Sequence, residues 1–198
     1  MAAGAVAIYN EQIVDEADRR DIAAVLGGDE AAFARLVGRH QAAVGHLLWR
    51  FSREPAQREE LVQDTFVEAY FSLGRYRGDG AFGHWLARIA TRVGYRFWKR
   101  RSRQKAPLPL LDLDVAAPDG DLDPAAAGAA AHALLARLPA AERLVLTLVY
   151  FDNCSVQEIA HRMGWTRAMV KMRAYRGRRR LKAIAQREHL RERLGWMS

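Results

Sequence analysis

Residues 155–176 have the sequence SVQEIAHRMGWTRAMVKMRAYR, which predicts two helices joined by a tight turn. Ser155 and Glu158 have the spacing of a capping box, in which each side chain bonds the other residue's backbone N–H and begins a helix. Gly164 suits the turn, because glycine takes a positive φ without a steric penalty. Ala160 is small enough for a second helix to cross close by. The stretch is therefore typical of a helix-turn-helix, the motif that places a helix in the DNA major groove.

The second helix of this motif is basic nearly all the way round, and its Val170 is expected to share a core with Ile159 and Met163. An ordinary helical hairpin with a solvated face is the plainer interpretation. Such a face would mix both signs of charge, whereas the run from Arg176 to Arg180 is densely cationic and suits phosphate contacts. The positions expected to project into a major groove are Thr166, Arg167, Lys171, Met172, Tyr175, Arg176, Arg178 and Arg179.

Upstream of the motif, residues 129–138 and 140–151 favour a pair of helices, with Pro139 at the start of the second, where proline is tolerated. The chain before this pair has a different composition. Residues 106–124 hold four of the six prolines, five aspartates and no basic residue, and such a segment does not form a packed helix. We interpret residues 106–128 as a flexible acidic linker.

The N-terminal half has apolar residues at three- and four-residue steps, which is the period of a helix. A short helix is expected over residues 15–27, a longer one after the capping residue Asp29, a third from Ala56 to Gly74, and a fourth after the loop at residues 75–80. No stretch alternates as a strand does, so we expect an all-α fold of two small helical domains. The expected division is an N-terminal extension and first helix (1–27), a first domain (28–105), the linker (106–128), a helix-turn-helix domain (129–185) and a helical tail (186–198).

Aromatic and basic side chains are interleaved in the loop at residues 75–80 and in the helix after it. By periodicity Phe82, Trp85 and Phe97 are core positions. The other aromatic rings could stack on unpaired bases while arginines hold the backbone, a mixture that suits single-stranded DNA. These candidates are Tyr76, His84, Tyr95 and Trp98.

The charge balance favours a polyanionic partner, because 31 Lys and Arg against 23 Asp and Glu give a net charge of +8. Cys154 is the only cysteine and the six histidines lack metal-ligand spacing, so we expect a reducing cytoplasmic location, no cofactor and no metal site. Cys154 is better explained as a small buried side chain than as a redox switch.

The apolar run at residues 2–9 is too short to span a membrane. No carboxylate cluster, phosphate-binding glycine loop or nucleophile with its base indicates an enzyme.

Two parts of the chain resemble one protein family, in the family's order. Residues 60–66 (ELVQDTF) and 76–82 (YRGDGAF), with the pairs at 85–86 and 89–90, are similar to region 2 of the extracytoplasmic-function (ECF) sigma factors of bacterial RNA polymerase. The residues similar to their region 4 are Leu138-Pro139, Tyr150-Phe151, Ser155, Glu158-Ile159-Ala160 and Val170-Lys171-Met172-Arg173. The resemblance covers residues 28–103 and 132–183 and implies a transcription initiation factor.

The resemblance implies three contact surfaces. The outward face of the helix at residues 56–74 would dock on the clamp helices of core RNA polymerase through Glu60, Leu61, Gln63 and Asp64. The first domain would capture a flipped base and the melted strand of the minus-ten element, and we assign to this site Tyr76, Arg77, Asp79, His84, Arg88, Arg92, Tyr95, Arg96 and Trp98. The outward residues of the helix-turn-helix would bind the duplex minus-thirty-five element. An anti-sigma factor, usually membrane-associated, would hold the protein inactive, and the acidic linker would thread the RNA exit path.

Three positions depart from the family pattern near the expected base-reading surfaces: Arg92 stands where many members have Asn, Glu68 where a Lys is found, and Met172 where Ser is frequent. The promoter sequence and the inducing stimulus therefore stay open. One alternative function also stays open, a two-domain helix-turn-helix regulator that binds duplex DNA without polymerase. That alternative leaves the aromatic loop and the surface at residues 60–66 without a role.

Overall fold

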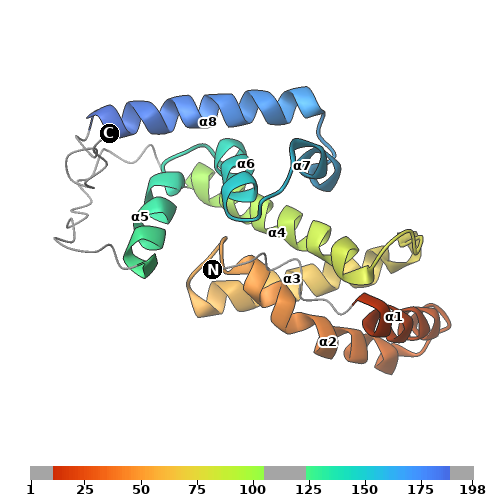
Figure 1. The fold of residues 1–198 in the computed structure, drawn as a ribbon. Helices are drawn as coiled ribbons and strands as arrows, with labels where there is room; N and C mark the ends of the chain where they lie inside the picture. The colour runs from red at the N-terminus through yellow and green to blue at the C-terminus, as the bar shows by residue number, and fades with distance from the viewer. Residues whose placement is uncertain (1–10, 105–123, 188–198) are drawn as a thin grey trace. The chain divides into compact units, whose positions relative to one another are not determined.

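The structure, a computed structural model, describes residues 11–104 and 124–187, and every regular element within these two ranges is helical (Figure 1). The predicted all-α fold class is confirmed. The chain divides into two compact units that meet in the sequence at Trp98 and Lys99. We call them the N-terminal unit and the C-terminal unit and describe each by itself.

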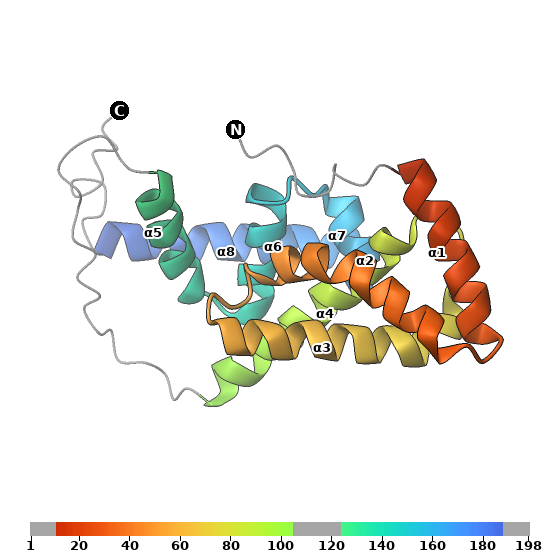
Figure 2. The same ribbon diagram turned by 90° about the horizontal axis from the view of Figure 1, so that it is seen from below.

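The N-terminal unit contains α1 (Glu11–Leu26), α2 (Glu30–Leu48), α3 (Pro55–Ser72), the 3₁₀ helix η1 (Leu73–Arg75) and most of α4 (Phe82–Gln104). α2 packs against both α1 and α3, and α1 also contacts η1 (Figure 1, Figure 2). Asp29 begins α2 as predicted, because its carboxylate accepts hydrogen bonds from the backbone N–H of Ala31 at 3.0 Å and of Ala32 at 3.3 Å.

The core of the N-terminal unit is apolar, and its fully buried side chains include Leu36, Leu48, Leu61, Leu73, Phe82, Leu86 and Val93. Gly94 allows a close approach of α4, since a Cβ at this position would lie 2.4 Å from the ring of Phe51. The Phe51 ring also packs on Trp98, with ring centroids 4.5 Å apart, and the Trp98 indole Nε1 donates to the Phe51 carbonyl at 2.9 Å. Trp98 is therefore a core residue that ties α4 to the turn after α2.

A polar network joins α1 to α2. His40 and Asp18 are both buried, and the His40 Nε2 lies 2.8 Å from one carboxylate oxygen of Asp18. Arg39 donates from Nε to the other Asp18 oxygen at 3.0 Å and also pairs with Asp21, to which Arg35 donates at 2.8 Å. Burial raises the pKa of Asp21, but the hydrogen bonds from Arg39 and Arg35 outweigh burial and leave this pKa below its ordinary value. α1 is thus packed into the unit that contains α2.

The C-terminal unit contains α5 (Pro124–Ala136), α6 (Ala140–Tyr150), α7 (Val156–Met163) and α8 (Arg167–Arg187). α8 packs on α6 and α7, and the buried side chains here include Leu144, Leu146, Leu148, Ile159 and Val170. Gly177 brings α8 close to α6, because a Cβ on this glycine would lie 2.9 Å from the Leu146 side chain.

The predicted linker at residues 106–128 was wrong at its C-terminal end, because α5 begins at Pro124. Proline is favourable in a first helical turn, and the three alanines that follow it have the highest helix propensity of any residue. Residues 106–123 of the predicted linker and residues 188–198 of the predicted tail lie outside the described residues.

Candidate nucleic-acid and protein interfaces

The helix-turn-helix has the local geometry that the sequence predicts. Ser155 Oγ accepts from the Glu158 N–H at 3.2 Å, and the Glu158 carboxylate accepts from the Ser155 N–H at 2.7 Å, which completes the capping box. The hydrogen bond from the Ser155 backbone is the main reason that the pKa of Glu158 is lowered. Gly164 takes a φ of +67° in the turn, and Thr166 Oγ1 accepts from the Met169 N–H at 3.2 Å at the start of α8.

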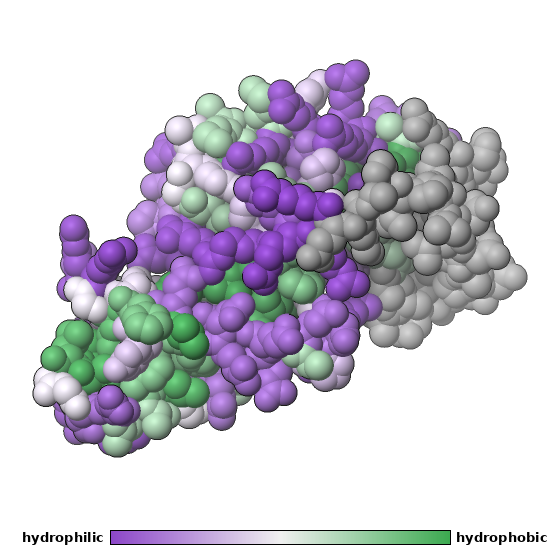
Figure 3. Space-filling view, turned by 180° about the vertical axis from the view of Figure 1, so that it is seen from behind, coloured by the Kyte–Doolittle hydropathy of each residue, from purple (hydrophilic) through white to green (hydrophobic). Residues whose placement is uncertain are grey.

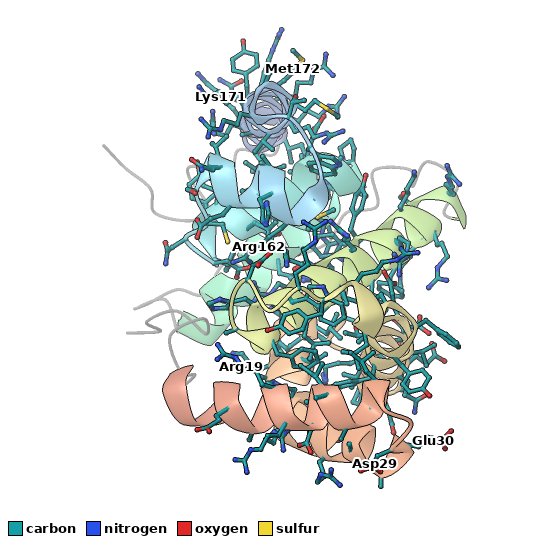
Figure 4. The ribbon with its side chains drawn as sticks, turned by 90° about the vertical axis from the view of Figure 1, so that its right-hand side faces the viewer. Arg19, Asp29, Glu30, Arg162, Lys171 and Met172 are labelled. Atoms are coloured by element: carbon teal, nitrogen blue, oxygen red, sulfur yellow. The ribbon has the colours of Figure 1, made fainter. Side chains whose placement is uncertain are left out.

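α8 has a buried face and an exposed face. Val170, Ala174 and Gly177 are buried. Figure 4 shows Lys171 and Met172 on the outer side of α8, away from the helices that it packs on. All of the positions predicted to enter a major groove are exposed: Thr166, Arg167, Lys171, Met172, Tyr175, Arg176, Arg178 and Arg179. The geometry leaves these side chains accessible, and their contact with DNA stays a prediction.

Two arginines of α8 have partners within the C-terminal unit. The Arg173 guanidinium lies 3.7 Å from the centre of the Trp165 ring, a cation–π contact. Arg180 Nη1 donates at 2.7 Å to Oε1 of Glu142, a buried residue in the first turn of α6. Sequence reasoning did not identify this ion pair, because nothing local distinguishes Arg180 from its neighbours in the basic run.

Tyr76 is the centre of an aromatic cluster in the N-terminal unit. Its ring centroid lies 5.6 Å from that of Phe82 and 5.5 Å from that of Trp85, and its hydroxyl donates to the Gly80 carbonyl across the loop. Gly78 has a φ of +75° within this loop. Tyr76 is half-buried and Trp85 is only partly covered, so the cluster reaches the surface. Of the other predicted residues here, the exposed ones are Arg77, Asp79 and His84.

The predicted basic residues of α4 follow the helix away from this cluster. Arg92 and Arg96 are exposed, whereas Arg88 is half-buried, as is the aromatic Tyr95. Arg96 forms an ion pair with Glu68 of α3. Eight residues separate Arg88 from Arg96, about 12 Å along a helix. The candidate minus-ten residues thus form an extended strip rather than one pocket.

Trp98 was wrongly predicted to lie on this strip. Only 4% of its surface is exposed, whereas Phe97, which was predicted to be core, is half-buried. The indole N–H of Trp98 explains the difference, because it is satisfied inside the unit by the Phe51 carbonyl.

The outward face of α3 contains three of the four residues predicted to dock on polymerase. Glu60, Gln63 and Asp64 are exposed. Leu61 was wrongly placed with them: it is 2% exposed and lies in the core, because it is out of helical register with its polar neighbours.

Sequence reasoning missed two apolar side chains on the same helix, Val67 at 55% and Phe71 at 82% exposure. They follow Gln63 and Asp64 at steps of three and four residues, so they extend the same face. Tyr70 on the same helix is 40% exposed, although its ring contacts Phe33 with centroids 5.0 Å apart. In the space-filling view, hydrophobic side chains gather at the lower left, over the helices of the N-terminal unit (Figure 3). Large exposed apolar groups of this kind mark interaction surfaces.

A helix-turn-helix in one helical unit and an aromatic and basic strip in another define a class of two-domain DNA-binding proteins. Residues 36–104 match the family Sigma-70 region 2, and residues 129–181 match Sigma-70, region 4. The RNA polymerase sigma-H factor of Pseudomonas aeruginosa is 30% identical over 183 residues, which cover 84% of this chain and 92% of that protein. The ECF RNA polymerase sigma factor SigM of Mycobacterium tuberculosis is 30% identical over 167 residues, 84% of each chain.

A solved structure has a similar fold. CnrH in complex with the cytosolic domain of CnrY aligns with a TM-score of 0.54 at 26% identity, covering 86% of this chain and 97% of that one. The chain belongs to the extracytoplasmic-function group of the sigma-70 family, whose members are non-catalytic transcription initiation factors. Among the described helices, none has the length and apolar character to cross a bilayer.

Proposed function

We propose that this chain joins core RNA polymerase, directs it to specific promoters and assists their melting. The exposed face of α8 carries this proposal, because its cationic side chains Arg167, Lys171, Arg176, Arg178 and Arg179 all face solvent. Cations in this arrangement neutralise DNA phosphates, and a recognition helix reads base edges in the major groove. The C-terminal unit would bind the minus-thirty-five element through the helix-turn-helix domain at residues 129–185.

We assign polymerase docking to the outward face of α3 in the N-terminal unit. Glu60, Gln63 and Asp64 combine there with the exposed apolar side chains of Val67 and Phe71. An apolar centre with polar groups beside it is the composition of surfaces that protein partners cover. The domain at residues 28–105, with α1 packed on it, would therefore attach the protein to the clamp helices.

Capture of the melted minus-ten strand is assigned to the aromatic and basic strip of the same domain. The Tyr76 cluster offers aromatic faces for an unpaired base, and Arg77, His84 and Arg92 are exposed around it and along α4. Base stacking and backbone neutralisation together stabilise single-stranded DNA, so opening would be driven by binding rather than by nucleotide hydrolysis. The chain itself would carry out no catalytic step.

Control by an anti-sigma factor is part of the proposal. CnrH was solved bound to the cytosolic domain of CnrY, which provides a precedent for a related chain. An anti-sigma protein, membrane-associated in the usual arrangement of this group, would cover the α3 face while the chain is in the cytoplasm. Polymerase could then dock only after that protein is released.

Purification with core polymerase separates this proposal from the alternative of a regulator that acts alone. We expect the full-length chain to co-purify stoichiometrically with core polymerase and to start RNA synthesis at discrete sites on genomic DNA fragments. Core polymerase without the chain is the control. Duplex binding by the free chain with no association and no initiation would favour the lone regulator and contradict the proposal.

Duplex binding is expected to depend on single cations of α8. Replacing Lys171 or Arg176 with Ala should weaken binding of the polymerase complex to the upstream element about tenfold and lower the salt slope of the affinity by about one. The measurement is binding to a promoter duplex over a salt series. Arg20→Ala removes the same charge from an exposed site on α1 and serves as the matched control. Equal losses for Arg20→Ala and Lys171→Ala would show that only net charge matters.

A further inference from the structure

The middle of the exposed face of α8 is apolar. Residues 168, 172, 175 and 179 are separated by steps of four, three and four, so they form one line along the helix. This line runs opposite the buried Val170, Ala174 and Gly177. Its first three members are Ala168, Met172 and Tyr175, and it becomes basic only at Arg179. We call Ala168, Met172 and Tyr175 the apolar line.

The apolar line exposes large side chains to solvent. Met172 is 52% exposed and Tyr175 is 59% exposed, and Met169 beside them is 41% exposed. Exposed apolar groups of this size that are gathered on one surface indicate a binding partner. Met172 and Tyr175 are predicted to face DNA, and the chemistry that they recognise there is set by their apolar side chains.

The charges beside the apolar line identify that partner. Lys171 and Arg178 follow one side of the line and Arg176 the other, all exposed. No acidic residue occurs between Arg162 and Arg187. A helix in the major groove meets phosphates at its two sides and base edges along its middle. The pattern of cations outside and apolar groups inside therefore complements the groove of a DNA duplex.

In that groove the apolar group on a base edge is the C5-methyl of thymine. Alanine and methionine provide no hydrogen bond suited to reading a base, but they pack well on a methyl group. The line from Ala168 to Tyr175 is about 10 Å long, at 1.5 Å per residue, which corresponds to about three base-pair steps. It also lies in the N-terminal half of α8, the part of a recognition helix that contacts base edges.

We propose that Ala168 and Met172, supported by the ring of Tyr175, read thymine methyl groups in the upstream promoter element. The inference rests on the proposed binding of the minus-thirty-five element by α8, and it adds the class of base recognised there. An element read in this way contains thymine on at least one strand within about three consecutive base pairs.

The test removes methyl groups from the DNA and leaves its hydrogen-bonding edges intact. The full chain, assembled with core polymerase, first selects bound duplexes from a pool with a random upstream element. The selected duplex is then made with deoxyuridine in place of thymidine, one position at a time. At one or more positions we expect binding to weaken about fourfold, the factor that corresponds to burial of one methyl-sized group.

Two variants separate methyl recognition from general affinity. Met172→Ala should abolish the difference between thymidine and deoxyuridine at one of these positions. Lys171→Ala should weaken binding of both duplexes equally and leave their ratio unchanged. Both side chains are exposed, so neither change should disturb folding.

Two outcomes would overturn the inference, and they are distinguishable. If selection yields a defined element but every deoxyuridine duplex binds as well as its thymidine parent, the apolar line does not read methyl groups and promoter binding still stands. If the assembled polymerase selects no element at all, the proposed function fails and the inference fails with it.

Discussion

Arg180→Ala is expected to lower the free energy of unfolding of the C-terminal unit by about 2 kcal/mol, because it leaves a carboxylate buried without its cation. The side chain of Glu142 is 8% exposed, and its Oε1 accepts from Arg180 at 2.7 Å. Within the described residues, Oε2 of Glu142 has no hydrogen-bond partner, so the carboxylate has no second donor to replace the lost cation. The Arg180 side chain is 52% exposed, which lets water screen the pair and places the loss below that of a fully buried one.

Two further variants identify the cause. Arg179→Ala removes the same charge from an exposed neighbour, so unfolding in urea should change by no more than about 0.5 kcal/mol. Glu142→Gln combined with Arg180→Ala should recover at least half of the loss, because a buried amide costs less than a buried charge. Hydrogen exchange in α6 and α8 locates the effect. Equal unfolding curves for Arg179→Ala and Arg180→Ala would mean that the ion pair adds no stability.

The features that were predicted correctly from the sequence are local. The capping box at Ser155, the turn at Gly164 and the cap at Asp29 each depend on residues within four positions of one another. Their hydrogen bonds form within one helical turn, so residue type and spacing are sufficient to predict them. The exposed face of α8 was also predictable, because its buried residues repeat with the helical period.

The errors concern which face of a helix is buried, and that depends on distant partners. The sequence of α4 offers Phe97 and Trp98 as neighbouring aromatic residues, and periodicity favoured Phe97 for the core. The Phe51 carbonyl that accepts from Trp98 is 47 positions away, and Gly94 shapes the space for the Phe51 ring. Leu61 was assigned to the surface with its sequence neighbours, although adjacent residues on a helix point about 100° apart.

Ion pairs between helices were the other feature that the sequence did not reveal. Arg96 was predicted as a residue that holds DNA, but in the structure it pairs with Glu68. Charged side chains are abundant on these helices, so sequence alone permits many pairs. The fold places Glu68 of α3 beside Arg96 of α4, and DNA that uses Arg96 must compete with Glu68.

Asp18→Ala is expected to have the larger effect on stability, a loss of about 3 kcal/mol from the N-terminal unit. Asp18 is 2% exposed, and its two oxygens lie 2.8 Å from His40 Nε2 and 3.0 Å from Arg39 Nε. Without the carboxylate, the fully buried imidazole of His40 loses this partner. Arg39 then keeps its ion pair with Asp21 and a hydrogen bond of 3.4 Å to the Ala17 carbonyl. Removal of one member of a buried charged set costs more than the set itself contributes, because the remaining groups stay desolvated.

Glu16→Ala is the matched control, since it removes an acidic side chain from an exposed position of α1 only two residues away. Its unfolding in urea should stay within about 0.5 kcal/mol of the unaltered chain. Asp18→Asn keeps the size of the side chain and an acceptor oxygen, so its loss should fall between the two. Because the network joins α1 to α2, hydrogen exchange should rise first in α1 when Asp18 is replaced. If Asp18→Ala and Glu16→Ala unfold at the same urea concentration, the polar network does not hold α1 in place. The packing of α1 on α2 would then depend on apolar contacts, such as that of the buried Ile22.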